Sequence, residues 1–317
     1  MTPNNTPVAV TSRSFSKHPE LRRVLSERYP NTTFNDAGES LRGDGLIGFL
    51  KGHEKAITAL EPLDAALFDA VPELRVVAKY GVGLDMIDLA AMQARGVKLG
   101  WTAGVNRRAV AELALGFALT LIRRLPESLR LVADGGWRQI SGRQLSGRPV
   151  GIIGLGHVGK DLVRLLHPFG CRVRAHDLKT DAAFCREFGV EMTDLDTLLR
   201  ESQIVSVHLP LDDSTRGMIG ARQLALMPDG AILINTARGA IIDEVALAAE
   251  LTAGRLGAGG FDVFAVEPPA GNPLIGLANF LATPHIGGST EEAVLAMGLA
   301  AIEGLDNSGD PLAVARG

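Results

Sequence analysis

The sequence predicts an α/β protein built from two doubly wound parallel-sheet domains. Short apolar runs alternate with amphipathic helical patterns along most of the chain, which is typical of repeated strand–helix–strand units. The 317 residues are enough for two ordinary domains, and a hydrophobic content of 46% is typical of a globular protein. The 37 glycines suit the many tight turns that such a fold requires.

The N-terminal part of the chain predicts the elements of one domain. VAVT at 8–11 is the first expected strand, and HPELRRVLSERYP at 18–30 is an amphipathic helix that ends at a proline. GLIGF at 45–49 and LRVVAKY at 74–80 are expected to be further buried strands. LDAALFDAVP, at 63–72 between them, is expected to be a helix.

A more regular pattern follows in the second half. A long helix rich in alanine and leucine is expected over 109–125, either as a core helix or as a subunit interface. From residue 149, six apolar runs predict six parallel strands, which suits a complete dinucleotide-binding (Rossmann) domain. These runs are VGIIGL, CRVRAH, IVSVHLP, AILINTA, GAGGFDVF and FLATPHI. A helix over 291–305 is expected to close the chain.

A glycine-rich loop follows the first of these six strands. The sequence GLGHVG at 154–159 lies between an apolar run and a helical pattern. The first glycine permits a tight turn, the second lets the backbone approach a pyrophosphate, and the third lets the helix pack on the strand. N–H groups at the start of the helix would bind phosphate oxygens. The residues expected to contact a dinucleotide here are Gly154, Gly156, His157, Val158 and Gly159.

The acidic residue Asp177 ends the second strand of this domain. A carboxylate at this position can accept hydrogen bonds from the ribose hydroxyls and would repel a 2′-phosphate, so NAD is expected as the cofactor. Arg174 and Lys179 flank Asp177 and weaken the preference for NAD over NADP. The plainer alternative is a glycine-rich turn followed by a surface aspartate.

Three charged residues follow later strands of the same domain. Arg238 lies in LINTARGAIID, Glu267 in FDVFAVEPP and His285 in LATPHIGG. Ligands of open α/β sheets bind at the carboxyl ends of the strands, so all three are expected on the ligand side. Arginine can hold a carboxylate, histidine can exchange a proton near neutral pH, and a neighbouring carboxylate favours the charged histidine. Each residue alone could be a solvated loop residue, but together they predict one functional site at the ligand side of the sheet.

These segments resemble the D-isomer-specific 2-hydroxyacid dehydrogenase family along nearly the whole chain. GIIGLGHVG, HLPL, LINTARG, DVFAVEPP and TPHIGG match the landmarks of the family in order and spacing, while KYGVGLDMID and AVAELALGFAL resemble its substrate loop and first cofactor-domain helix. The resemblance implies an NAD-dependent enzyme that interconverts a 2-keto acid and a D-2-hydroxy acid by hydride transfer. Arg238 would anchor the substrate, and His285 would be the acid/base paired with Glu267.

The resemblance also implies a domain arrangement and further contacts. A Rossmann NAD-binding domain (101–286) would be inserted into a discontinuous, flavodoxin-like substrate-binding domain (1–100 and 287–317), and a homodimer would form through roughly 101–145. Further cofactor contacts would fall on Val110, His208, Pro210, Thr215, Thr236, Ala237, Asp262 and Gly288, with Asp262 on the nicotinamide carboxamide. Substrate contacts would fall on Lys79, Tyr80, Gly81, Val82 and Gly83, together with Arg238 and His285.

Two departures from the family pattern concern the substrate. The family loop commonly reads Asp-Asn where this chain has Asp85-Met86. The turn after the strand expected at 45–49 contains Lys51 and His53, in place of the Arg-Ser-x-Thr often seen in phosphoglycerate dehydrogenases, which argues against 3-phosphoglycerate. Lys51, His53 and Lys79 could face another substrate, or the first two could be solvated turn residues. We also expect no C-terminal regulatory domain of the kind that some phosphoglycerate enzymes carry.

Composition argues against several other function classes. The formal net charge of −4 predicts no general attraction to nucleic acid or to an anionic membrane. The sequence contains no uncharged run of 18 apolar residues, so we expect no membrane span. The N-terminus does not resemble a signal peptide, and the two cysteines lack metal-type spacing, so we expect a cytoplasmic protein without a metal site.

Two alternative functions stay open at the level of sequence. One is a non-catalytic NAD-binding regulator, because corepressors that resemble this family keep the triad. The other is a family oxidoreductase that acts on another small anion such as phosphite. Formate enzymes of the group typically carry glutamine at the position of Glu267, so the glutamate argues against formate.

Overall fold

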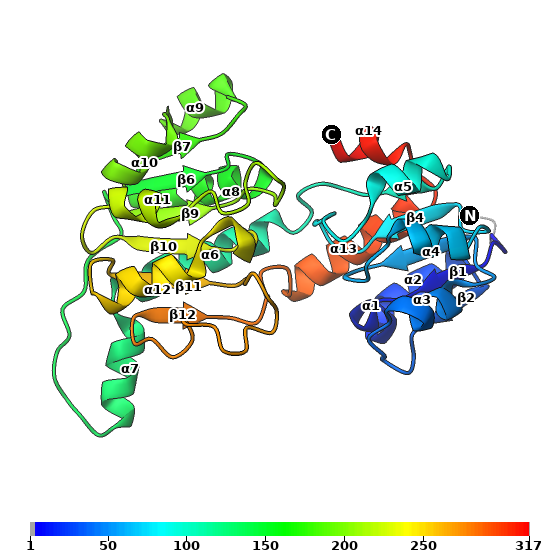
Figure 1. Cartoon of the computed structure of the whole chain (residues 1–317), viewed down its shortest axis with the longest axis horizontal. Coiled ribbons are helices and arrows are strands. Elements are labelled where there is room, and N and C mark those ends of the chain that lie inside the picture. Colours follow the sequence, from blue (N-terminus) through cyan, green and yellow to red (C-terminus); the bar gives the residue numbers. More distant parts are fainter. Residues whose placement is uncertain (1–3, 317) are drawn as a thin grey trace. The chain divides into compact units, whose positions relative to one another are not determined.

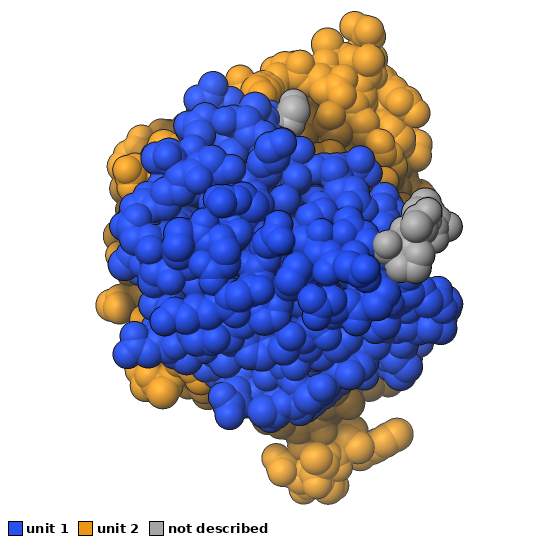
Figure 2. All heavy atoms as spheres, turned by 90° about the vertical axis from the view of Figure 1, so that its right-hand side faces the viewer, with its two compact units in different colours: residues 1–106, 289–317 blue, residues 107–288 orange. Residues whose placement is uncertain are grey.

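The computed structural model describes residues 4–316 and divides into two compact units. Unit 1 consists of Met1–Asn106 and Ser289–Gly317, and unit 2 is Arg107–Gly288 (Figures 1 and 2). Within the described part of the chain, none of the helices combines the length and apolar character needed to cross a membrane. The substrate-binding and cofactor-binding roles of the two units stay predictions.

Unit 1 contains a five-stranded parallel sheet in the order β2-β1-β3-β4-β5. Its strands are β1 (Val8–Val10), β2 (Thr32–Phe34), β3 (Lys55–Thr58), β4 (Val76–Lys79) and β5 (Lys98–Gly100). Its helices are α1 (Arg13–Lys17), α2 (Pro19–Arg28), α3 (Gly43–Leu50), α4 (Ala65–Ala70), α5 (Leu89–Ala94), α13 (Glu291–Gly304) and α14 (Pro311–Arg316).

Alternating side chains of β1 divide the core of unit 1 between the two faces of the sheet. Ala9 belongs to one apolar cluster with residues of α3 and α4, whereas Val8 and Val10 belong to another with residues of α2 and α13. Successive side chains of a strand point to opposite faces, so helices cover both faces of this sheet. The unit is therefore doubly wound, as the sequence predicts.

The strand expected at 45–49 is wrong, because this segment is the helix α3. Leu46 and Leu50 are fully buried and lie four residues apart on one helical face. A short apolar run cannot distinguish a strand from a buried helical turn by its pattern alone. The sheet position is instead taken by β3, which the sequence analysis did not identify, and β2 and β5 were missed as well.

Unit 2 contains a seven-stranded parallel sheet in the order β12-β11-β10-β9-β6-β7-β8. Its strands are β6 (Pro149–Ile153), β7 (Arg172–His176), β8 (Glu191–Met192), β9 (Ile204–Val207), β10 (Ile232–Asn235), β11 (Ala258–Phe261) and β12 (Phe280–Ala282). All six expected strands are present, and β8 is an additional two-residue edge strand. The order reverses between β6 and β9, which makes the ends of these strands the switch point of the sheet.

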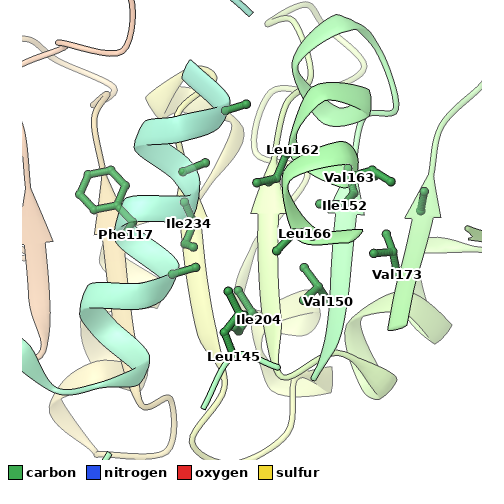
Figure 3. Close-up of a cluster of buried hydrophobic side chains, with 14 of the residues drawn as sticks. Phe117, Leu145, Val150, Ile152, Leu162, Val163, Leu166, Val173, Ile204 and Ile234 are labelled. Carbon is green, nitrogen blue, oxygen red and sulfur yellow. The ribbon is translucent and has the colours of Figure 1, made fainter. Parts of the chain in front are cut away.

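Helices again cover both faces of the unit 2 sheet. They are α6 (Arg107–Ile122), α7 (Leu125–Ala133), α8 (His157–Leu166), the 3₁₀ turn η1 (His167–Phe169), α9 (Ala182–Phe188), α10 (Leu195–Glu201), α11 (Ala221–Leu226), the 3₁₀ turn η2 (Gly239–Ile241) and α12 (Glu244–Thr252). Ile152 of β6 packs with residues of α6 and α8, in the cluster that Figure 3 shows. The next residue, Ile153, points to the other face of the sheet and packs with residues of α10, α11 and α12.

The long helix expected over 109–125 ends three residues early. α6 stops at Ile122, and Arg124 has a left-handed backbone (φ 54°) that breaks the helical path. A separate helix, α7, then begins at Leu125. Arg123 and Arg124 at the break are both exposed, and Pro126 lies in the first turn of α7, where proline is tolerated.

A close backbone approach in unit 1 gives a stability prediction. A Cβ atom on Gly100 of β5 would lie 2.1 Å from the carbonyl oxygen of Gly304 at the end of α13. We expect Gly100→Ala to lower the free energy of unfolding by about 1–3 kcal/mol, because backbone atoms must move apart. The matched control is Gly48→Ala in α3, where no atom lies within 4 Å of the new Cβ. This control should raise stability by up to about 1 kcal/mol.

Urea unfolding of both variants measures this difference. Equal stabilities for Gly100→Ala and Gly48→Ala would contradict the close approach between β5 and α13.

Candidate active site

The carboxyl ends of the unit 2 strands collect most of the residues that the sequence analysis selected. Arg238 follows β10, Asp262 follows β11 directly, and His285 follows β12. These strands are parallel and adjacent, so their carboxyl ends lie at one edge of the sheet. This edge is the ligand side of an open α/β sheet.

His285 and Glu267 form an ion pair at this edge. The Nδ1 atom of His285 lies 2.8 Å from Oε2 of Glu267, and the other carboxylate oxygen, Oε1, accepts a hydrogen bond from the backbone N–H of Phe264 at 3.0 Å. The side chains of His285 and Glu267 are 40% and 38% exposed within the described structure. The Nε2 atom of His285 makes no hydrogen bond to any described residue, so it is available to a bound molecule.

This ion pair shifts the protonation of both groups. The hydrogen bond to Glu267 raises the pKa of His285 above its usual value, although burial and the positive charge of Arg238 oppose the shift. Burial acts to raise the pKa of Glu267, but the hydrogen bonds from His285 and Phe264 outweigh it and hold that pKa below its usual value. The pair therefore favours a protonated imidazole beside an ionised carboxylate.

Arg238 is held at the end of β10 by local hydrogen bonds. The buried side chain of Asn235 accepts from the N–H of Ala237 at 3.0 Å and donates to the carbonyl of Arg238 at 2.9 Å. The next residue, Gly239, lies so close to Phe264 that a Cβ atom would come within 1.9 Å of its carbonyl carbon. Because only glycine permits this approach, the segment of Arg238 packs against the segment that leads to Glu267.

Asp262 organises the loop that carries His285. Its carboxylate is buried and accepts hydrogen bonds from the Thr283 hydroxyl at 2.6 Å and from the N–H groups of Ile286 and Gly287, both at 2.7 Å. The N–H of His285 donates to the carbonyl of Asp262 at 2.9 Å. His285 has a left-handed backbone (φ 54°), which is unfavourable for a non-glycine residue unless its surroundings impose it. The contacts of Asp262 supply that constraint.

The glycine loop has the geometry of a phosphate site. Gly154 has a left-handed backbone (φ 96°), and a Cβ atom on Gly159 would lie 2.1 Å from the carbonyl oxygen of Gly154. No atom lies within 4 Å of a Cβ built on Gly156, so the space above the middle of the loop is open. Gly156 caps α8 without a side-chain hydrogen bond, which leaves backbone N–H groups for an anion.

Two polar atoms near this loop are buried without a partner in the described structure. They are Nδ1 of His208 after β9 and the hydroxyl of Thr236 after β10. Burial lowers the pKa of His208 to about 3, so the imidazole is neutral and can donate or accept a hydrogen bond. Unpartnered buried polar atoms are unfavourable, and both lie where a bound cofactor could satisfy them. These residues therefore fit an NAD cofactor.

Asp177 lies at the end of β7 beside the glycine loop. Its carboxylate accepts hydrogen bonds from the N–H of Leu155 at 2.6 Å and from the N–H of Lys179 at 2.9 Å. Arg174 forms ion pairs with Glu191 and Glu201, which offset the positive charge that the sequence places near Asp177. The local charge at Asp177 is therefore more negative than the sequence alone indicates.

The other predicted cofactor residues of unit 2 lie around the same edge, although their contacts to a cofactor stay predictions. The Thr215 hydroxyl donates to the carbonyl of Pro210 at 2.7 Å and closes the loop after β9. Val110 of α6 is buried against Gly287, where a Cβ atom would lie 3.4 Å from the Val110 side chain. Ala237 and Gly288 lie next to Arg238 and Gly287 in the chain.

The predicted substrate residues of unit 1 lie at the carboxyl end of β4. Lys79 is 4% exposed, and its ammonium group donates to the carbonyl of Ala59, which follows β3. Tyr80 is buried, and Gly81 has φ 128°, so the loop turns at once after the strand. The carbonyl of Val82 accepts a hydrogen bond from the Trp101 indole at 3.0 Å. With Gly83, these residues form a loop whose substrate role stays a prediction.

The structure corrects the position of Lys51 and His53. Both precede β3, so they lie at the amino end of that strand, away from the carboxyl edge. The His53 ring contacts the Thr33 hydroxyl at 2.9 Å. Ala59, Leu60 and Glu61 are the residues that follow β3, so the residues at 51–54 carry no argument about 3-phosphoglycerate.

Comparison with known proteins shows the family to which this chain belongs. The model of the D-isomer specific 2-hydroxyacid dehydrogenase NAD-binding domain matches residues 115–287. The chain is 38% identical to a hydroxypyruvate reductase of Thermotoga maritima over 244 residues, which cover 75% of this chain and 79% of that protein. It is 37% identical to a D-3-phosphoglycerate dehydrogenase of Archaeoglobus fulgidus, covering 80% of this chain and 48% of that protein, and so spans about half its length.

A solved structure shows the same similarity over both units. The D-lactate dehydrogenase of Aquifex aeolicus, crystallised with NAD and lactic acid, superposes with a TM-score of 0.83 at 26% identity, covering 94% of this chain and 93% of that chain. With the fold and site geometry above, these matches show that the chain belongs to the D-isomer specific 2-hydroxyacid dehydrogenase family and carries its NAD-binding domain.

Sequence reasoning missed two residues that shape the candidate site. Asn235 fixes the turn at Arg238, and the signal was an amide residue at the end of an apolar run. Trp101 holds the loop after β4 and was missed because β5, the strand before it, was not identified.

Proposed function

We propose that this protein reduces a 2-keto acid to the corresponding D-2-hydroxy acid, and catalyses the reverse reaction, with His285 as the acid/base. The observation that carries the proposal is the ion pair between His285 and Glu267, which leaves Nε2 of His285 without a partner in the described structure. The hydroxypyruvate reductase and lactate dehydrogenase relatives act on small acids of this class, according to their names. The alternative functions have no specific observation in their favour.

Each residue of the triad has a separate task in this reaction. When bound, the nicotinamide cofactor supplies or accepts the hydride. Arg238 binds the substrate carboxylate and stabilises the negative charge that develops on the keto oxygen. His285, protonated at Nδ1 and Nε2, donates the Nε2 proton to that oxygen during reduction and takes it back during oxidation. Glu267 keeps the imidazole charged and oriented, and Asp262 holds the loop that places it.

Further contacts of the proposed site follow the same reasoning. The N–H groups of the glycine loop would bind the cofactor pyrophosphate, and Asp177 would accept hydrogen bonds from the ribose. His208 and Thr236 would gain the partners that they lack in the described structure. In unit 1, N–H groups of the loop at 80–83 would bind the substrate carboxylate.

Replacement of His285 tests the proposal. We expect His285→Gln to lower kcat for NADH oxidation by about 10²- to 10⁴-fold, because the reaction loses its proton donor, while NADH affinity changes little. Absorbance at 340 nm with glyoxylate, hydroxypyruvate, pyruvate and phosphohydroxypyruvate measures the rate, and nicotinamide fluorescence measures binding. The matched control His53→Gln changes a histidine that precedes the amino end of β3 in unit 1, and it should leave kcat unchanged. Wild-type kcat in His285→Gln would overturn the proposal.

We also propose that the protein forms a homodimer through α7 and the segment that follows it. None of the residues of α7 is buried, and Leu129, Val132 and Trp137 are 69%, 54% and 92% exposed. Figure 1 shows α7 extending from the body of unit 2, to which Arg130 donates a hydrogen bond at the carbonyl of Ala278. Large apolar side chains that are exposed within one short segment are typical of an interface.

A charge on α7 tests the dimer. We expect Leu129→Glu to convert a dimer into a monomer in sedimentation velocity, because a carboxylate would have to be desolvated in the interface. The control Val245→Glu places the same charge at a residue of α12 that is 70% exposed, and it should leave the mass unchanged. A monomeric wild-type protein, or a dimer that survives Leu129→Glu, would contradict this interface.

A further inference from the structure

A polar cavity lies in unit 2, between the start of α6 and one side of α8, next to the glycine loop. It has a volume of about 360 Å³. Its lining residues come from the start of α6 and from positions along α8, and all of them carry charged or titratable side chains. They are Arg107, Arg108, His157, Lys160, Asp161 and Arg164. Of these, only His157 belongs to the predicted cofactor site.

The spacing of these residues places them on one side of α8. Positions 157, 160, 161 and 164 are three, four and seven residues apart, so they line one face of the helix. The side chain of Asp161 is 5% exposed and pairs with Arg108 (Nε to Oδ2, 3.1 Å) and with Arg164 (NH1 to Oδ1, 3.4 Å). These contacts fix the two arginines, from α6 and α8, at the wall of one cavity.

The cations of this cavity outnumber the carboxylates that neutralise them. Asp161 serves both Arg108 and Arg164, and Asp181 pairs with Lys160 at 2.7 Å. The guanidinium group of Arg107, at the start of α6, makes no ion pair or hydrogen bond with any described residue. Like charges held together in a concave site create a strong positive potential, which an anion can neutralise.

We propose that this cavity binds a phosphate-class anion, carried by a small phosphorylated molecule that regulates the enzyme. Arginine guanidinium groups bind phosphate oxygens through paired, charge-assisted hydrogen bonds, and the cavity offers such groups from two helices. A volume of about 360 Å³ has room for more than the phosphate group itself. The proposal goes beyond the reaction proposed above and does not depend on its triad.

The cavity is distinct from the pyrophosphate position of the cofactor. A cofactor pyrophosphate would contact the glycine loop and the first turn of α8. Arg164 lies seven residues after His157, which is about 10 Å further along the helix axis. His157 is the one residue shared by both sites, so an anion in the cavity places negative charge next to the cofactor phosphates. Binding of the two anions should therefore be mutually unfavourable.

Calorimetric titration with inorganic phosphate and with pyrophosphate tests the site. We expect saturable binding to the wild-type chain and at least about tenfold weaker binding to Arg107→Gln/Arg164→Gln, which removes cations from both helices of the cavity. The matched control is Arg42→Gln, which removes an exposed arginine from unit 1. It should bind both anions like the wild type. Thermal unfolding checks that the double variant keeps its fold, and the single variant Arg107→Gln gives an independent test with no ion pair broken.

A second measurement separates this site from the cofactor site. Pyrophosphate should raise the Kd of NADH for the wild type and do so much less for the double variant, whereas competition at the glycine loop itself would be equal in both. Equal phosphate affinity in all variants, or an equal effect on NADH binding, would overturn the proposal. Loss of keto-acid turnover in His285→Gln has no bearing on either result, so the two proposals fail separately.

Discussion

The buried carboxylate of Asp262 is the contact on which the candidate active site depends most. Three donors from the segment 283–287 converge on its two oxygens, and its own carbonyl accepts from the N–H of His285. A carboxylate that is removed from water requires such donors, so Asp262 can be buried only if the loop at 283–287 follows this path. The same hydrogen bonds hold the loop in that path. As a result, His285 adopts a left-handed backbone, its Nδ1 atom pairs with Glu267, and its Nε2 atom stays accessible to a bound molecule.

Parallel strand geometry explains why residues far apart in the sequence meet at this edge. β9, β10, β11 and β12 are adjacent, and each ends at the same side of the sheet. The ends carry a neutral histidine whose Nδ1 atom is buried, an arginine, a buried aspartate and a protonatable histidine in that order, at His208, Arg238, Asp262 and His285. One edge therefore combines neutral hydrogen-bonding groups with charged side chains, in a chain that belongs to this dehydrogenase family.

The sequence predicted unit 2 better than unit 1 for a physical reason. The central strands of unit 2, β6, β9, β10 and β11, are buried on both faces and read as continuous apolar runs. The motifs that follow the strands identified Arg238, Glu267 and His285. In unit 1, β2 and β3 carry charged or polar residues, such as Lys55, whereas α3 contains the more apolar run. Because the run at 45–49 is the more apolar one, it was predicted to be a strand although it is part of the helix α3. Hydrogen bonds that depend on tertiary contacts, such as Trp101 to Val82, leave no periodic signal.

The pH dependence of keto-acid reduction, compared between the wild type and Glu267→Gln, tests the central claim most directly. Reduction requires protonated His285, so activity should be full below the pKa of His285 and fall as the pH rises through it. Glu267 raises that pKa, and the fall in kcat/KM should therefore occur above the usual histidine range in the wild type. In Glu267→Gln, which keeps a hydrogen-bonding side chain without its charge, we expect the fall to move down by about one pH unit or more. Identical pH profiles for the two proteins would contradict the account.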